Sequence, residues 1–402
     1  MRNYFYNLAA AKPEGNGLAS DSQSHKPEGN ACLPARQGLA SNSQSHQKKG
    51  CLASIIRLFL LVLSCFYGLL IRILRLFYSR APLRFNCKVI SVGNITWGGT
   101  GKTPLVECIA RYLKEKGHKI AILSRGYKRK NRPLRGAQIA SSKTMGDEPY
   151  MLSRSLGSVP VIVDAQRARG AAWAVKGYGV EAVLLDDGFQ QWRIKKDLEI
   201  VVIDAASPFG NRHMIPRGVL REPLSALRRA DIFVLTKINL LSQDTSALRD
   251  FLRLMNPQAE IFESAYEPMG FYLVSSAGRD DSQPGRGALL NVDALRGKTV
   301  TLVSGIANPD SFEHLIRRLG IGIGLSFQFP DHYAYQEPLM EDIVKKSRAQ
   351  NIDTIVTTEK DSVRMPAKTS GAQISIFALR IELKITNNEK EFFNRISGVF
   401  TN

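Results

Sequence analysis

The residues GNITWGGTGKTP at 93–104 combine the side chains that binding of nucleotide phosphates requires. Glycines let backbone N–H groups approach phosphate oxygens, a lysine neutralises the β- and γ-phosphates, and a hydroxyl binds magnesium. Thr96 stands where the first glycine of the G-x-x-x-x-G-K-[ST] pattern would be, so the match is incomplete. The residues expected to hold the phosphates of ATP are Gly98, Gly99, Thr100, Gly101, Lys102 and Thr103.

Two aspartates supply the second half of such a site. EAVLLDDGFQ at 181–190 is typical of an apolar strand, and it ends in Asp186 and Asp187. P-loop enzymes hold Mg²⁺ with a carboxylate in this position, directly or through water. One aspartate at a strand end is often an ordinary turn residue, but two in succession favour a metal site. We therefore expect Thr103, Asp186 and Asp187 to bind Mg²⁺.

Further polar clusters follow other apolar runs, at SRGY (124–127), GDEP (146–149), GNRHMIPRGVLREP (210–223) and FPDHYAY (329–335). In open α/β sheets the ligand crevice lies beyond the carboxyl ends of the strands, where such clusters can converge. Asp147 is a candidate base for a hydroxyl group, and His332 a candidate for orienting it. Taken alone, Asp147 is as well explained as a helix cap, and His332 as a satisfied histidine. Arg125, Arg217 and Arg221 could hold phosphate bidentately or be surface charges.

A further motif, TKIN at 236–239, follows another apolar run. Its spacing is that of the N/T-K-x-D element with which P-loop proteins recognise guanine. The last position holds Asn239 in place of the aspartate. We therefore interpret the segment as the end of a strand. Asp361 in TTEKD likewise follows no loop lysine at the spacing of this guanine-binding element.

The segments around these motifs alternate between apolar strands and amphipathic helices from Phe85 onward. This alternation predicts an α/β fold, a P-loop NTPase-like doubly wound parallel sheet with helices on both faces. A stretch rich in Gly, Ser and Asp at 275–298 indicates a boundary before a second, smaller α/β domain. The predicted division is a disordered extension (1–50), a membrane-anchoring helix (51–82), the P-loop core (83–280) and a smaller domain that closes over the site (281–402).

The segment before the core, at 52–79, is almost entirely apolar. Between Arg57 and Arg72 lie fourteen uncharged residues, fewer than the ~18–20 of a comfortable membrane span. On a helix, the three arginines of the segment gather into a narrow stripe with Ser64 and Gly68. The pattern favours an anchor that lies in the headgroup plane, and a tilted span with snorkelling arginines is the alternative. A buried core helix would have to hide three arginines.

The first fifty residues are built from repeats. KPEGN occurs twice, and GLASDSQSH returns as GLASNSQSH. Such a run of Ser, Gly, Gln, Pro and Asn buries too little apolar surface to offset chain entropy, so we predict disorder. No apolar stretch begins near Met1, so a secretory signal is not indicated.

The 402 residues carry a formal net charge of +19. This excess fits nucleic acid, an anionic membrane surface or a phosphorylated substrate. The charge is spread along the chain, and no basic run is interleaved with aromatic residues, so no nucleic-acid partner is expected. The five cysteines form no CxxC pair, which argues against a disulfide framework and a zinc site.

Together the motifs resemble one family, the tetraacyldisaccharide 4'-kinases of lipid A biosynthesis. The resemblance runs from about residue 52 to about 365 and rests on VGNITWGGTGKTP, LSRGY, GDEPYML, DDGFQ, FGN, LREP, SGIANP, FPDHYAY and TEKD, in order and spacing. The family tolerates a residue other than glycine at the position of Thr96. It usually has histidine directly after DDGFQ, where this chain has Gln191, so an imidazole role there is in doubt.

The resemblance implies a kinase that uses ATP and Mg²⁺ to phosphorylate the 4'-hydroxyl of an acylated glucosamine disaccharide 1-phosphate. It also implies the cytoplasmic face of the inner membrane of a Gram-negative cell, with the lipid and the membrane surface as partners and no obligate protein partner. In that family the GDEP aspartate and the D-H histidine act as the base, which here are Asp147 and His332. The residues expected to contact substrate or nucleotide are Asn94, Arg125, Tyr127, Arg221 and Glu222.

A membrane-tethered P-loop switch or partition-type ATPase is the alternative from another class. It accounts for the phosphate loop, the two aspartates and the apolar helix. It gives no role to Asp147 together with His332, and it needs no lipid acceptor. Stimulation by lipid, as opposed to a protein partner, would distinguish the kinase from it.

Overall fold

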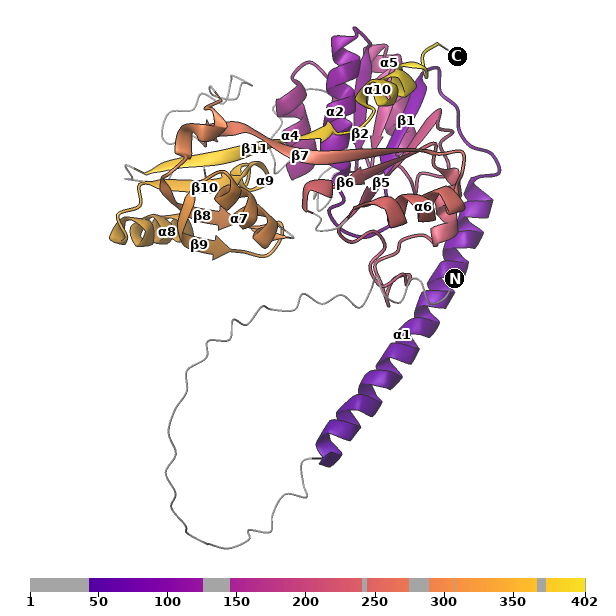
Figure 1. The fold of residues 1–402 in the computed structure, drawn as a ribbon. Helices are drawn as coiled ribbons and strands as arrows, with labels where there is room; N and C mark the ends of the chain where they lie inside the picture. The colour runs from indigo at the N-terminus through magenta and orange to yellow at the C-terminus, as the bar shows by residue number, and fades with distance from the viewer. Residues whose placement is uncertain are drawn as a thin grey trace, which may run out of the picture. The chain divides into compact units, whose positions relative to one another are not determined.

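The computed structural model describes residues 43–125, 145–240, 244–274, 289–306, 308–366 and 374–401, with side chains from residue 54 onward. Residues Ile55–Asn402 form one compact unit built on a single sheet (Figure 1). The strands, in the order in which they pair across the sheet, are β3 (Val161–Val163), β2 (Ile120–Ser124), β4 (Ala182–Asp186), β1 (Lys88–Gly93), β5 (Leu198–Asp204), β6 (Ile232–Thr236), β7 (Glu260–Leu273), β11 (Ser375–Ile385), β10 (Thr354–Thr358), β8 (Thr299–Ser304) and β9 (Gly322–Gln328).

Neighbouring strands within the described ranges pair in parallel, except β7 and β11, which are antiparallel. The helices that connect or cover them are α2 (Lys102–Glu115), α4 (Asp147–Leu156), α5 (Arg167–Tyr178), α6 (Ser246–Met255), α7 (Pro309–Arg318), α8 (Glu337–Ala349), α9 (Glu359–Ser362) and α10 (Glu389–Ser397). The predicted fold class, a P-loop NTPase-like doubly wound sheet, is confirmed.

Successive side chains of a strand point to opposite faces of the sheet. Helices cover both faces of this sheet, so both sets of side chains are buried. Ile90 and Val92 of β1 belong to a core cluster with the apolar face of α2. Val89 of the same strand packs in a second cluster with Ala171 and Ala174 of α5. This arrangement explains why the first strands read as continuous apolar runs without polar alternation.

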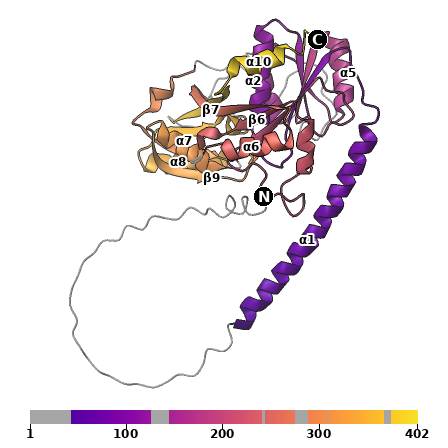
Figure 2. The ribbon, with the colours of Figure 1, turned by 45° about the vertical axis from the view of Figure 1, so that its right-hand side comes forward.

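The two longest strands, β7 and β11, link the strands on either side of them. β7 pairs with β6 near its start and with β11 along most of its length. After β11 the chain returns to the P-loop half of the sheet, where Phe393 of α10 stacks on Tyr112 of α2 with ring centroids 4.3 Å apart. Both ribbon views place α10 beside α2 (Figures 1 and 2). The division of the chain at 280/281 stays a prediction, but α10 packs with residues of the predicted P-loop core.

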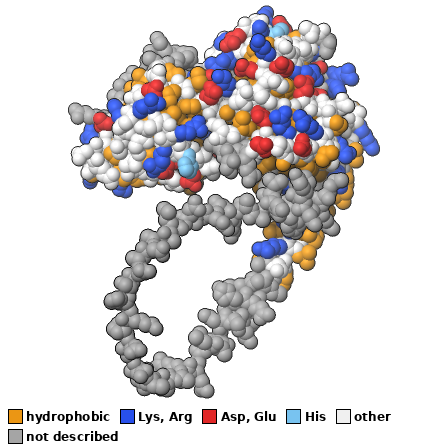
Figure 3. Space-filling model, viewed as in Figure 1, with side chains coloured by type: hydrophobic (Ala, Val, Ile, Leu, Met, Phe, Trp, Pro, Cys, Tyr) orange, Lys and Arg blue, Asp and Glu red, His pale blue; other side chains and the backbone are white. Residues whose placement is uncertain are grey.

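The predicted N-terminal helix is present as α1 (Ser43–Tyr78). It begins inside the segment predicted to be disordered, since no proline separates Ser43 from the apolar run and a helix propagates once nucleated. Its part Ser54–Tyr78 is long and apolar enough to cross a membrane, judged by length and composition. Many of its apolar side chains are exposed, and orange patches mark apolar side chains on the part of the helix that is visible in Figure 3.

Candidate active site

The phosphate loop joins β1 to α2 and is shaped by glycines. Gly98 has a φ of 124° and Gly101 a φ of 91°, values that strain any residue with a Cβ. Gly101 also lies against Tyr266, because a Cβ here would be 2.3 Å from the phenol oxygen. Lys102 begins α2, so the loop ends at the positive end of a helix. This is the geometry that the GKT motif predicts.

Buried hydrogen bonds support this loop. The side chain of Asn94 is inaccessible to solvent, and its Nδ2 donates to Thr100 Oγ1 at 3.0 Å. Thr236, at the end of β6, donates its hydroxyl to the carbonyl of Thr100 at 2.8 Å. Arg221 donates to Asn94 Oδ1 at 3.4 Å. Asn94, predicted to contact substrate or nucleotide, thus has its side chain engaged with protein groups.

Asp187 neutralises the positive side chains next to the loop. It follows β4 in a left-handed conformation, with a φ of 58°. Its Oδ1 accepts from Arg221 at 2.8 Å and lies 3.7 Å from Lys102 Nζ. Burial raises the pKa of Asp187, but the charges of Lys102 and Arg221 outweigh it, and the net pKa lies below the usual range. Asp187 is therefore a carboxylate at neutral pH.

Asp186 fits a magnesium ion. It is only 3% exposed, and its Oδ1 has no hydrogen-bond partner among the described residues. Burial, followed by the charges of Glu148 and Asp187, raises the pKa of Asp186 to about 7. A divalent cation would supply both the missing partner and the missing positive charge. The described residues contain no cluster of three or more His, Cys, Asp or Glu side chains suited to a metal. Mg²⁺ would therefore combine Asp186 and Thr103 with phosphate oxygens and water.

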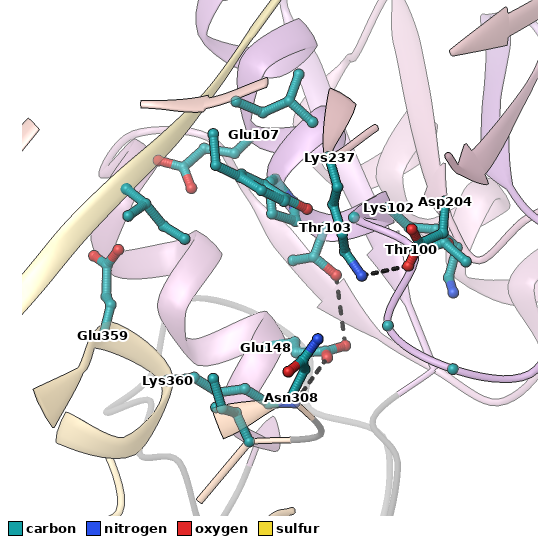
Figure 4. A pocket seen from close by; sticks show the side chains of 18 of the residues that line it. Thr100, Lys102, Thr103, Glu107, Glu148, Asp204, Lys237, Asn308, Glu359 and Lys360 are labelled. Carbon is teal, nitrogen blue, oxygen red and sulfur yellow. Dashed lines mark hydrogen bonds and ion pairs between the residues drawn. The ribbon is translucent and has the colours of Figure 1, made fainter. Parts of the chain in front are cut away.

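Two charged residues beside this site were missed by sequence reasoning. Figure 4 shows Glu148 between the hydroxyl of Thr103 and the ammonium of Lys360. The Thr103 hydroxyl donates to Glu148 Oε2 at 3.5 Å, and Lys360 Nζ lies 3.7 Å from Glu148 Oε1. The signals that could have found these residues are their places in GDEP and TEKD.

Asp147 and His332, distant in the chain, meet in the structure. Asp147 begins α4, and its Oδ2 lies 3.2 Å from His332 Nδ1. The same oxygen accepts from Arg364 Nε at 2.7 Å. Partial burial raises the pKa of Asp147, but the hydrogen bond with His332 and the charge and hydrogen bond of Arg364 outweigh it, so the net pKa is lowered. The contact is present, and the catalytic role of the pair stays a prediction.

Arg364 is the third member of this cluster, and sequence reasoning missed it. Its side chain is 5% exposed and lies 3.3 Å from Asp361 Oδ1. Asp361 is fully buried, and its Oδ2 accepts from the backbone N–H of Gly305 at 3.0 Å. Asp361 therefore holds Arg364 in place, and Arg364 in turn holds the Asp147 carboxylate.

The other residues predicted to contact substrate or nucleotide differ in whether they line the cavity of the phosphate loop. Arg125 and Arg221 line the same cavity as the phosphate loop. Glu222 does not line it: the side chain is 1% exposed, and its oxygens accept from Arg229 and from Gln190 Nε2. Its position supports a structural role, because a buried carboxylate needs such partners. Tyr127 lies outside the described residues.

Helix α1 packs on the loop that carries Arg221. The Ser64 hydroxyl donates to the carbonyl of Met214 at 2.8 Å, and the Tyr67 hydroxyl donates to the carbonyl of Arg221 at 3.3 Å. Gly68 lies against the Met214 side chain. Ser64 and Gly68, the small residues of the predicted stripe, thus let α1 approach this loop closely. The same loop carries Arg221, which donates to Asp187.

These groups line one cavity of about 2400 Å³. Its lining includes the phosphate loop, the two aspartates, Asp147 and His332, and it extends to Tyr67 of α1. Ligand pockets for small molecules are typically ~300–1,000 Å³. The volume is therefore ample for a nucleotide together with a large second substrate.

Comparison with known proteins agrees with this geometry. Residues 56–401 match the family model described as Tetraacyldisaccharide-1-P 4'-kinase. The tetraacyldisaccharide 4'-kinase of Halothermothrix orenii is 34% identical over 353 residues, which cover 83% of this chain and 90% of that protein. That of Anaeromyxobacter dehalogenans is 37% identical over 319 residues, covering 77% and 81%.

Among solved structures, LpxK from Aquifex aeolicus in complex with ATP is similar to this chain. The TM-score is 0.66 at 28% sequence identity, over 86% of this chain and 99% of that one. The likeness thus extends over most of this chain and nearly all of that one. The chain belongs to the tetraacyldisaccharide-1-phosphate 4'-kinase family.

Proposed function

We propose that this chain transfers the γ-phosphate of ATP to the 4'-hydroxyl of a tetraacylated glucosamine disaccharide 1-phosphate, with the residue roles given below. The family supplies the reaction, a kinase step of lipid A biosynthesis. The observation that supports the site is that one cavity holds both the phosphate loop and the Asp147–His332 pair.

The chain's part in phosphoryl transfer is mostly positioning and charge neutralisation. Gly98 to Thr103 would hold the triphosphate, with Lys102 at its β- and γ-oxygens. Asp187 keeps Lys102 and Arg221 oriented before the nucleotide binds. Thr103 and Asp186 would hold Mg²⁺, which when bound supplies positive charge to the bridging phosphate oxygens.

Asp147 would accept the proton of the attacking sugar hydroxyl. Its lowered pKa keeps it ionised at neutral pH, and a weak base suffices because the transition state of phosphoryl transfer is loose. Arg364 and His332 fix the carboxylate from two sides. They act as positioning residues in this proposal.

The direct test is transfer of γ-³²P from ATP to purified disaccharide 1-phosphate in detergent micelles. We expect label at the 4'-position, in an amount that depends on the disaccharide. Hydrolysis of ATP that ignores the disaccharide would instead favour the P-loop switch ATPase.

We further propose that α1 places the site at the cytoplasmic face of the inner membrane. The acyl chains of the acceptor stay in the bilayer, so the cavity must work at the headgroup surface. Arg72 and Arg75 lie in the last turns of α1, and Arg80 and Arg84 follow the helix on the way into the core. An excess of such residues favours the cytoplasmic side.

Replacing Phe59, Phe66 and Phe77 with serine is expected to release the protein from membranes. These side chains are 61%, 68% and 68% exposed, and each contributes about 1.5–3 kcal/mol when transferred from water to lipid. Ser64 and Tyr67 are untouched, so the packing of α1 on its loop is kept. The readout is flotation with vesicles that contain anionic lipid.

The matched control is Leu254→Ser on α6, which removes an apolar side chain that is 79% exposed. This control should float like the wild-type protein. Flotation of the triple variant to the same extent as wild type would show that α1 is not the anchor.

A further inference from the structure

The TKIN segment, interpreted from sequence as a strand end, lies beside the phosphate loop. Thr236 holds the Thr100 carbonyl, as described above. Lys237 has a φ of 61°, a strained conformation for a non-glycine residue, of the kind that clusters at functional sites. Its ammonium pairs with Asp204 next to Thr100 (Figure 4). Both Lys237 and Asn239 line the cavity.

Tyr266 connects Asn239 to the phosphate loop. Its phenol oxygen touches Gly101, and its backbone carbonyl accepts from Asn239 Nδ2 at 3.3 Å. Asn239 is therefore about one tyrosine side chain away from the loop. In a nucleotide, the ribose sets a similar separation between the α-phosphate and the base. A nucleotide held by the loop could thus place its base at Asn239.

The hydrogen-bonding capacity of Asn239 is only partly used. A carboxamide has two N–H donors and one acceptor oxygen. One N–H is donated to Tyr266, and Oδ1 is buried without a hydrogen-bond partner among the described residues. What remains is one acceptor and one donor. Adenine presents the complement, an N6 amino donor beside a ring nitrogen acceptor, and asparagine pairs with adenine in this way elsewhere.

Guanine presents the opposite pattern. The bond from Asn239 Nδ2 to the Tyr266 carbonyl holds the carboxamide in one orientation. With the base in the pose that brings adenine N6 to Oδ1, guanine would place its acceptor O6 there. The N1–H and N2–H₂ donors of guanine suit the two oxygens of an aspartate instead. An asparagine in this place therefore favours adenine over guanine. The same residue that breaks the guanine-reading motif in sequence explains the choice of base.

We propose that TKIN is the base-recognition segment of this enzyme and that Asn239 selects adenine through its carboxamide. The inference rests on the proposed function only in that the substrate is a nucleoside triphosphate held by the phosphate loop. It assigns a specificity-determining residue that is separate from the phosphate-transfer groups.

The test measures binding of three nucleotides in the absence of the lipid acceptor, by calorimetry with Mg²⁺ on the full chain in detergent. The nucleotides are ATP, GTP and purine riboside triphosphate, which lacks the 6-amino group. Wild type should bind ATP roughly three- to tenfold more tightly than the analogue, the value of one neutral hydrogen bond. In Asn239→Ala the two should bind equally, because the acceptor is gone.

Asn308→Ser is the matched control. Asn308 also lines the cavity and caps α7 by accepting from the Ser311 N–H, a role that serine can fill. This variant should keep the full preference for ATP over the analogue. An equal loss of preference in both variants, or an unchanged preference in Asn239→Ala, would overturn the proposal.

A second variant, Asn239→Asp, tests the choice between adenine and guanine. Its affinity for ATP should fall and its ratio of ATP to GTP affinity should drop at least tenfold, because a carboxylate repels the ring nitrogen of adenine and accepts from guanine. An unchanged ratio in a variant with wild-type circular dichroism and thermal midpoint would contradict the proposal. Failure of the kinase function is distinguishable, since it would appear as absent transfer with the base preference intact.

Discussion

Lys102→Ala is expected to lower kcat for phosphate transfer to the disaccharide by about 10²–10³-fold, or roughly 2.7–4 kcal/mol of transition-state stabilisation. Lys102 is the first residue of α2 and follows Gly101, the left-handed end of the phosphate loop. From that position its ammonium would neutralise charge on the β- and γ-oxygens as the bond to the leaving group lengthens. Asp187, which it now faces at 3.7 Å, keeps Arg221 as its partner, so the loop should not collapse.

The readout is the initial rate of γ-³²P transfer at saturating disaccharide, together with the dissociation constant for ATP. Lys116→Ala is the matched control, because Lys116 is an exposed residue at the other end of the same helix. It should leave both quantities within about twofold. If Lys102→Ala kept kcat within threefold of wild type, the loop would bind something other than the reacting phosphates.

The phosphate loop and the acidic pair could be predicted from sequence because their chemistry is local. A GKT run between a buried strand and an amphipathic helix leaves few alternatives, and Asp186–Asp187 end a strand that must lie next to β1. The alternation of apolar strands and helices likewise fixed the fold class. For the loop and for the acidic pair, the informative residues of each motif lie within about a dozen positions of one another.

Arg364 shows what local reasoning leaves out. The role of Arg364 depends on Asp147, which begins α4, and on Asp361, which is a buried residue of α9. Asp361 and Arg364 are only three residues apart, but no spacing in the sequence indicates that Asp147 meets them. The partners of Glu222 were equally hidden from sequence reasoning: this residue of the LREP motif, predicted to contact substrate or nucleotide, is buried and pairs with Arg229.

The TKIN segment illustrates a different limit. The strand end at Thr236 was predicted, and β6 ends there. The proximity of that end to Gly101 depends on β6 and β7 lying side by side, since Tyr266 comes from β7. Strand order across a sheet is a global property, and a motif with one unusual residue cannot be assigned before that order is known.

Asp147→Asn should lower kcat by about 10²–10⁴-fold, the contribution of a positioned general base. Asparagine matches aspartate in size and still accepts from Arg364 through its oxygen, so the cluster should stay folded. It cannot accept the hydroxyl proton. Binding of ATP should be unchanged, because Asp147 has no contact with the phosphate loop among the described hydrogen bonds and ion pairs.

The direction of the Asp147 pKa shift determines how kcat/KM should depend on pH. The Asp147 pKa lies below the usual range of an aspartate, because the hydrogen bond with His332 and the charge and hydrogen bond of Arg364 outweigh the effect of burial. The base is therefore active above that pKa, and the wild-type acid limb of kcat/KM due to this group should lie at lower pH than for an ordinary aspartate. Arg364→Met removes a positive charge, raises the Asp147 pKa and should move that limb upward, so that activity is lost at a higher pH.

Asp331→Asn is the matched control for Asp147→Asn. Asp331 is a neighbouring carboxylate, 3.9 Å from His332 Nε2 and 3.4 Å from Lys360. The Asp331→Asn substitution also removes a negative charge beside His332, but at Nε2, whereas Asp147 lies at Nδ1. We expect a loss of less than tenfold. A larger loss in Asp331→Asn than in Asp147→Asn would transfer the role of base to the other carboxylate, and would leave Arg364 as a structural residue.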